Sequence, residues 1–171
     1  GALSDFTVTG ITDPTDTDTQ ESPVVTARDA YGNTKTDYVG TVTFTSNDGS
    51  ATLPADYTFL AGDNGVKTFT NGVQLQSVGT FFVQVADGAF TGTQSNIDVN
   101  VGAIDNFTVT GIADPTDTDT QHSAVVTARD AAGNTKTNYV GTITFTTDAG
   151  SSSLPADYTF LAGDNGVKTF T

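Results

Sequence analysis

The sequence contains no cysteine, methionine or tryptophan, and its single histidine is His122. Without cysteine the chain cannot form a disulfide, use a thiol nucleophile or bind a metal through thiolates. A nucleophile–base triad could be built only once, through His122. No helix-forming segment follows a glycine-rich stretch as a phosphate-binding loop requires. We therefore expect no enzymatic activity.

Basic residues are scarce as well. Six Lys and Arg residues oppose 20 Asp and Glu residues, which gives a formal net charge of −14. Such a chain repels nucleic acid and anionic lipid headgroups, so neither is expected as a partner. No stretch approaches the roughly 20 apolar residues of a membrane-spanning helix, so no membrane insertion is expected in this segment. The absence of an initiator methionine predicts a piece of a longer product.

Threonine, glycine and aspartate dominate what is present. Threonine is the commonest residue, glycine reaches 18, and every acidic residue except Glu21 is aspartate. Threonine favours strands, whereas glycine and aspartate favour turns. No segment shows a convincing 3.6-residue apolar period. The composition therefore predicts an all-β fold.

An internal repeat organises the sequence. Gly1–Thr70 aligns without gaps on Gly102–Thr171, and the two copies differ at 14 positions. One unit is therefore about 101 residues long, a common length for a β-sandwich domain. We predict a first repeat over residues 1–101 and a second repeat over residues 102–171.

Period-two alternation between turn signals predicts about seven strands in the first unit. In the strand at Gly40–Ser46, Val42 and Phe44 should face the core, while the threonines between them face water. The Gly-Asp-Asn-Gly run at 62–65 is predicted to be a hairpin turn, because its residues tolerate positive φ. The predicted strands are Asp5–Ile11, Pro23–Asp29, Gly40–Ser46, two within Leu53–Thr70 (the second continuing through Val73–Gln76), Thr80–Asp87 and Ser95–Val101.

The runs VVTARDAYGNTKTDYVGTVTFTS, ATLPADYTFLAGDNGVKTFT and GTFFVQVAD resemble the bacterial immunoglobulin-like repeats of large surface proteins, including invasin-type and related adhesin arrays. The resemblance covers almost the whole unit. It implies tandem immunoglobulin-like β-sandwiches that serve as stalk or scaffold modules outside the cell. The sequence departs from the usual pattern of such repeats at PTDTDTQES, where a short stretch of small residues is more common.

The second copy stops at Thr171, the equivalent of Thr70, and lacks counterparts of the strands at Thr80–Asp87 and Ser95–Val101. We expect this second, incomplete unit to expose Ile143 and Phe145 and to leave strand edges unpaired. Either the chain is part of a longer tandem array, or a neighbouring molecule supplies the strands by β-augmentation. In both cases the expected partner is another copy of the same repeat, in cis or in trans.

The acidic run DPTDTDTQ occurs twice, at Asp13–Gln20 and Asp114–Gln121. Calcium takes six to eight oxygen ligands, which carboxylates, threonine hydroxyls and carbonyls can provide. The run matches no EF-hand loop, and aspartate and threonine also cap turns without a metal. A calcium site and a self-capping turn both remain open, and calcium is the one cofactor under consideration. The candidate ligands are Asp13, Asp16 and Asp18, with Asp114, Asp117 and Asp119.

Two further sets of residues lie at predicted corners and loops. Asp29 with Asn33, and Asp130 with Asn134, should close the corner that follows the second strand. Tyr31, Tyr38 and Tyr57 could stack on a surface glycan, but Tyr38 and Tyr57 with their copies Tyr139 and Tyr158 are also predicted to anchor corners by hydroxyl-to-backbone bonds.

These patterns predict an extracellular structural repeat module of a microbial cell-surface stalk, adhesin or self-associating fibre. The alternative is an adhesin module that itself binds a glycan or a host protein.

Overall fold

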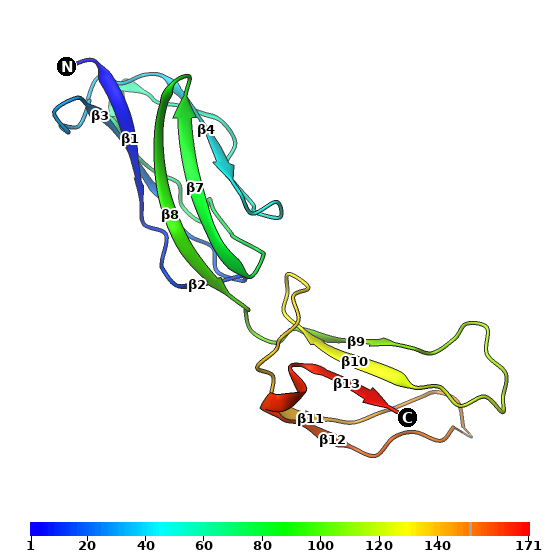
Figure 1. The fold of residues 1–171 in the computed structure, drawn as a ribbon. Coiled ribbons are helices and arrows are strands. Elements are labelled where there is room, and N and C mark those ends of the chain that lie inside the picture. The colour runs from blue at the N-terminus through cyan, green and yellow to red at the C-terminus, as the bar shows by residue number, and fades with distance from the viewer. Residues whose placement is uncertain (151) are drawn as a thin grey trace. The chain divides into compact units, whose positions relative to one another are not determined.

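The computed structural model describes residues 1–150 and 152–171, and within them the chain is built from β-strands and short 3₁₀ turns. The predicted all-β fold is confirmed. The chain divides into two compact units, Gly1–Asn100 and Val101–Thr171 (Figure 1). Among the described residues no helix is long and apolar enough to cross a membrane.

The first unit consists of two sheets that enclose a common core (Figure 1). The smaller sheet has the strand order β1–β3–β6, and the larger has the order β2–β8–β7–β4–β5. Every pairing is antiparallel except that of β2 with β8. The strands are β1 (Leu3–Thr9), β2 (Thr15–Asp16), β3 (Val24–Asp29), β4 (Thr41–Ser46), β5 (Tyr57–Thr58), β6 (Val66–Thr68), β7 (Gly79–Asp87) and β8 (Phe90–Asn100).

The core residues follow the period-two alternation of buried and exposed side chains that the sequence predicted. On β4, Val42 and Phe44 are buried while Thr41, Thr43 and Thr45 are exposed. On the facing sheet β1 and β3 contribute buried apolar side chains, and β7 and β8 contribute four more to the core. Each fully buried Val, Ile or Phe side chain contributes roughly 1.5–3 kcal/mol. The core residues from these strands are Phe6, Val8, Val25, Ala27, Val83, Val85, Ile97 and Val99.

The predicted hairpin at Gly62–Gly65 is wrong. Residues Ala61–Asp63 form the 3₁₀ turn η1, and the two flanking strands pair with different sheets, β5 with β4 and β6 with β3. The expected positive φ does occur, with 51° at Asn64 and 72° at Gly65. The chain therefore uses this turn to cross from one sheet to the other.

The region before β7 also differs from expectation. Val73 and Gln74 do not continue β6 but form isolated bridges with Glu21 and Thr52. The last strand, β8, starts at Phe90 rather than near Ser95, because it forms a long antiparallel hairpin with β7.

The second unit repeats only part of this arrangement. Strands β9 (Asn106–Thr110), β10 (Ala124–Arg129) and β13 (Val167–Phe170) form a sheet in the order β13–β10–β9. Strand β11 (Gly141–Ile143) pairs with β12 (Tyr158–Phe160), and the turn η2 (Ala162–Asp164) follows. The buried apolar residues of this unit are Val126, Ala128 and Phe160.

A close approach of β8 to β1 leaves no room for a side chain at Gly92. A Cβ atom at Gly92 would overlap the carbonyl oxygen of Phe6. We expect Gly92→Val to lower the free energy of unfolding of this unit by about 3 kcal/mol or more, because the backbone cannot yield as a side chain would. Denaturant unfolding with hydrogen exchange on residues 1–100 measures the loss. The neighbouring Thr91→Val, at an exposed position of the same strand, is the control, and equal effects of the two variants would contradict the prediction.

Candidate functional site: the open face of the second unit

Apolar residues that are buried in the first unit are exposed in the second. Phe6, Val8 and Ile11 are 4%, 4% and 5% exposed. Their counterparts Phe107, Val109 and Ile112 are 38%, 54% and 58% exposed. The same residue types on equivalent strands thus face solvent in one copy and the core in the other.

The difference arises because β7 and β8 cover this face in the first unit. Among the described residues of the second unit there is no counterpart of either strand. Residues 43–46 of β4 pair with β7. Strand β11 ends at Ile143, just before residue 144, which is the counterpart of residue 43. Ile143 and Phe145, predicted to be exposed, are half-buried, while Val42 and Phe44 are buried.

The uncovered face is hollowed into a groove of about 1450 Å³. Its aromatic floor keeps the geometry of the first unit: the ring centroids of Phe145 and Phe170 lie 4.8 Å apart, and those of their counterparts Phe44 and Phe69 lie 4.7 Å apart. The floor is therefore already formed although nothing covers it. Apolar residues lining the groove include Val109, Ile112, Phe145, Pro155, Tyr158 and Phe170.

The run DPTDTDTQ is a strand-pairing element in the first unit, which the sequence analysis did not predict. Strand β2 pairs in parallel with β8, so that Thr15 lies opposite Val99 and Asp16 opposite Asn100. The pairing continues as the Thr17 amide donates to the Asn100 carbonyl at 3.0 Å. Thr15 and Thr17 are buried beneath this contact while Asp16 and Asp18 are exposed. The Thr/Asp alternation was the signal that could have revealed a strand.

The buried carboxylate of Glu21 holds this run of the first unit in place. The Thr15 hydroxyl donates to Glu21 Oε1 at 2.7 Å, and the Thr12 hydroxyl donates to Oε2 at 3.3 Å. The backbone of Glu21 also exchanges two hydrogen bonds with Val73. In the second copy Thr12 is replaced by Ala113 and Glu21 by His122. His122 Nε2 contacts the hydroxyl of Thr116, the counterpart of Thr15.

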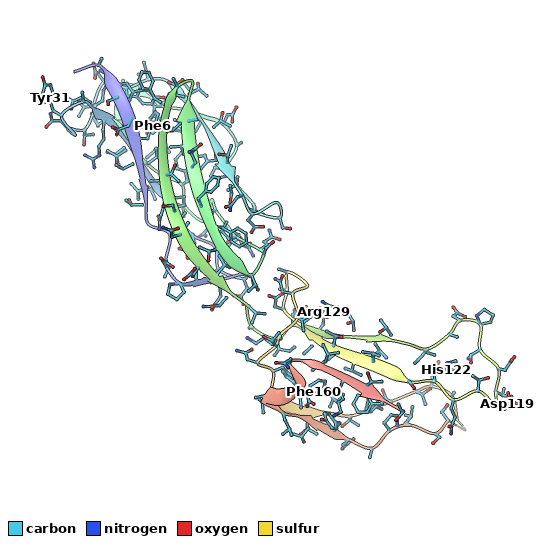
Figure 2. All side chains as sticks on the ribbon, in the orientation of Figure 1. Phe6, Tyr31, Asp119, His122, Arg129 and Phe160 are labelled. Atoms are coloured by element: carbon cyan, nitrogen blue, oxygen red, sulfur yellow. The ribbon has the colours of Figure 1, made fainter. Side chains whose placement is uncertain are left out.

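The corresponding run of the second unit is exposed from Asp114 to Gln121. Figure 2 places Asp119 and His122 on this segment, at the end of the unit away from Phe160.

The six candidate calcium ligands do not gather into a site. Asp13 Oδ1 accepts the Asp98 amide at 3.0 Å, while Asp16, Asp18 and the three counterparts in the second unit are exposed. Within the described residues no three acidic or histidine side chains are grouped as metal ligands would be. Each run contains a backbone turn, since the Thr19 and Thr120 amides donate to the backbone carbonyls of Asp16 and Asp117. Calcium binding by these residues stays a prediction.

The corner tyrosines bond to carboxylates, so the predicted hydroxyl-to-backbone bonds are wrong. Tyr38 donates to Asp87 Oδ2 at 2.8 Å, and Tyr57 donates to Asp63 Oδ2 at 2.9 Å. Burial first, and then the hydrogen bond to Asp87 and its charge, raise the pKa of the Tyr38 phenol. No residue that the structure describes in the second unit accepts a hydrogen bond from the Tyr139 hydroxyl. In the first unit the acceptor, Asp87, is the last residue of β7.

The candidate glycan-stacking tyrosines do not form one surface. Tyr38 is buried between Phe6 and Phe59, with ring centroids 5.3 and 5.0 Å away. Tyr31 is 87% exposed on the loop after β3 (Figure 2), and its counterpart in the second unit is Ala132.

Asp48 holds the segment that leads into β7. Its Oδ2 accepts the amides of Gln76 and Ser77 at 2.7 and 3.1 Å, and its Oδ1 accepts the Ser77 hydroxyl at 2.7 Å. Burial acts to raise the pKa of Asp48, but the hydrogen bonds from Ser77, Ser50 and Gln76 outweigh it and hold the pKa below its ordinary value. In the second copy this position is Ala149.

The corner after the second predicted strand is confirmed in both units. Asp29 Oδ1 accepts the amides of Tyr31 and Asn33, each at 3.0 Å, and Asp130 Oδ1 accepts the Asn134 amide at 2.7 Å.

The two corner tyrosines provide a matched comparison. We expect Tyr38→Phe to lower the free energy of unfolding of the first unit by roughly 1.5–3 kcal/mol, because it leaves the part-buried Asp87 carboxylate without its donor. Tyr139→Phe should change the second unit by less than about 0.5 kcal/mol, because no such bond is lost. Hydrogen exchange resolved to each unit distinguishes the two. Equal destabilisation by both variants would contradict the comparison.

Asp48 predicts a specific loss of stability in acid. Because its pKa in the folded unit is lowered, its stabilisation is complete above the ordinary carboxyl pKa of 3.8 and is lost as the pH falls through the lowered value. At pH 6 Asp48→Ala should cost the first unit roughly 2 kcal/mol, and the difference from the parent chain should shrink below about pH 4. Unfolding curves at several pH values test this. The exposed Asp56 supplies the control Asp56→Ala, and a pH-independent difference for Asp48→Ala would refute the assignment.

Comparison with known proteins gives a limited result. No model of a protein family matches the chain, and no curated protein matches it. Among the solved structures similar to it are two of the surface layer protein SbsC. Domains 4–9 of that protein match with 23% identity and a TM-score of 0.39, over 86% of this chain and 24% of that one. Domains 5–6 match with 22% identity and a TM-score of 0.38, over 86% of this chain and 74% of that one. The chain thus spans about a quarter of the length of the first structure, and no activity or partner follows from a likeness of this degree.

Proposed function

We propose that the chain is a structural repeat module of a microbial cell surface, in which immunoglobulin-like units follow one another along a stalk or fibre. One observation carries the proposal. Two nearly identical units form equivalent strands one after the other in a single chain. Serial repetition of one structural unit is typical of repeat architectures such as a stalk or fibre.

The polar side chains of the chain serve architecture rather than catalysis. Asp29, Asp48 and Asp63 each accept hydrogen bonds that hold a turn. In the described part of the chain no buried side-chain nitrogen or oxygen atom lacks a hydrogen-bond partner. These contacts support a scaffold role, because they hold turns in place.

Each unit also fastens the residue at its own beginning. In the second unit Asp130 Oδ2 accepts the Gly102 amide at 3.3 Å, and Lys136 Nζ donates to the Val101 carbonyl at 3.4 Å. In the first unit the equivalent Asp29 carboxylate lies 3.5 Å from the Gly1 amino group. A repeated clasp on the entering chain is what a series of units joined by short connections requires.

Surface exposure in the source organism tests the proposal. Antibodies against residues 1–100 should label intact cells, and protease added to intact cells should remove the labelled epitope. A cytosolic protein of the same cells serves as the control for lysis. An epitope that becomes accessible only after lysis would refute the cell-surface assignment.

A further inference from the structure

We propose that Asn106 is a modification site, at which a saccharide is attached to the side-chain amide nitrogen. Asn106, Phe107 and Thr108 form the only Asn-x-Ser/Thr pattern in the sequence, and this pattern is the acceptor signal for N-linked glycosylation in secreted proteins. The inference rests on the proposed placement at a cell surface, because the modification belongs to proteins that leave the cytosol. The substrate class is a saccharide carried on a lipid diphosphate.

Asn106 is exposed, and its exposure does not depend on the open face of the second unit. It is the first residue of β9, opposite Arg129 of β10, and β9 is an edge strand of its sheet. The counterpart Asp5 is exposed in the first unit as well, where β7 and β8 close the core. An attached saccharide therefore stays in solvent in a closed unit too.

The acceptor amide and the threonine hydroxyl belong to the same side of the strand. Residues two apart in a strand point to the same face of the sheet. In the first unit Phe6 and Val8 are buried, whereas Asp5 is exposed and Thr7 is half-buried on the opposite side of β1. Because Asn106 and Thr108 are the counterparts of Asp5 and Thr7, a saccharide there projects from the outer face and displaces no core side chain.

The transfer needs only the Asn106 carboxamide from this chain, and a transferase of the cell supplies the catalysis. Nδ2 forms a bond to the anomeric carbon of the saccharide, the bond from that carbon to the diphosphate oxygen breaks, and the lipid diphosphate leaves with the electron pair. Nδ2 loses one proton and keeps the other. In the structure Nδ2 donates to Asp105 Oδ2 at 2.7 Å, and the remaining N–H suffices for this hydrogen bond after transfer.

The first unit provides a control within the same chain. The run Asp5-Phe6-Thr7 differs from Asn106-Phe107-Thr108 only in its first residue. A carboxylate lacks the nitrogen to which an N-linked saccharide is attached. We therefore expect modification of the second unit and none at the corresponding position of the first.

Peptide mapping by mass spectrometry of the native protein from its source organism tests the site. The peptide that contains residue 106 should be heavier than its sequence by a saccharide, and a glycosylasparagine amidase should remove that mass and convert Asn106 to Asp. The peptide that contains Asp5 should have its sequence mass. Recovery of residue 106 entirely as unmodified asparagine would overturn the proposal, as would a saccharide that alkaline β-elimination releases from Thr108 instead.

Substitutions expressed in the source organism test the acceptor pattern. Asn106→Gln and Thr108→Ala should each abolish the saccharide, whereas Thr108→Ser should retain it because the hydroxyl is kept. Hydrogen exchange at the buried Val126 and Ala128 reports whether the second unit remains folded in these variants. A saccharide that persists at Asn106 in the Thr108→Ala chain would contradict the assignment.

Asp5→Asn provides a gain-of-function test, because it creates the same pattern at an exposed position of the first unit. This variant should carry a second saccharide on residue 5, and a variant modified only at Asn106 would count against the proposal. Surface labelling reports location and peptide mass reports modification, so the two proposals fail separately. A labelled but unmodified chain removes this inference alone, whereas an unlabelled chain removes the cell-surface assignment.

Discussion

The packing of the β7–β8 hairpin between β2 and β4 is the interaction on which the closed unit depends. With it, Val42 and Phe44 are buried and β4 runs to Ser46; without it, the same strand ends at Ile143 and Phe145 is half-exposed. The two copies thus act as a comparison made within one chain. The open unit loses burial on the face that the hairpin covers, whereas Val126, Ala128 and Phe160 remain buried in it.

Some contacts of the closed unit recur in the open unit without the hairpin, and others do not. The turn after β12 keeps its geometry: Asn165 has φ 51°, as Asn64 has, and Tyr158 donates to Asp164 as Tyr57 does to Asp63. This turn lies in the longest run that is identical in the two copies. Several substitutions fall instead at positions whose first-unit residues contact the segment around the hairpin, namely Glu21 to His122, Asn47 to Asp148 and Asp48 to Ala149.

Local periodicity was sufficient to predict β3, β4 and β7, because their alternation reflects one buried and one exposed face. It failed where the partner is distant in sequence. Strand β2 is only two residues long and pairs with β8, so its Asp/Thr run resembled a capping loop or a calcium site. The turn at 62–65 was mistaken for a hairpin, because the turn residues fix φ but not which sheet the next strand joins. The tyrosine corners were located correctly, yet their carboxylate acceptors were not: Asp63 lies in the turn η1 that was taken for a hairpin, and Asp87 lies 49 residues from Tyr38 on β7.

The aromatic packing shared by the two units does not depend on the hairpin. The ring centroids of Phe145 and Tyr158 lie 4.8 and 5.3 Å from that of Phe170. In the closed unit the centroids of their counterparts Phe44 and Tyr57 lie 4.7 and 5.4 Å from that of Phe69. Because the rings keep this spacing where no counterpart of β7 or β8 is described, the strands that both units share set it. The hairpin therefore covers an aromatic cluster that neighbouring strands have already positioned.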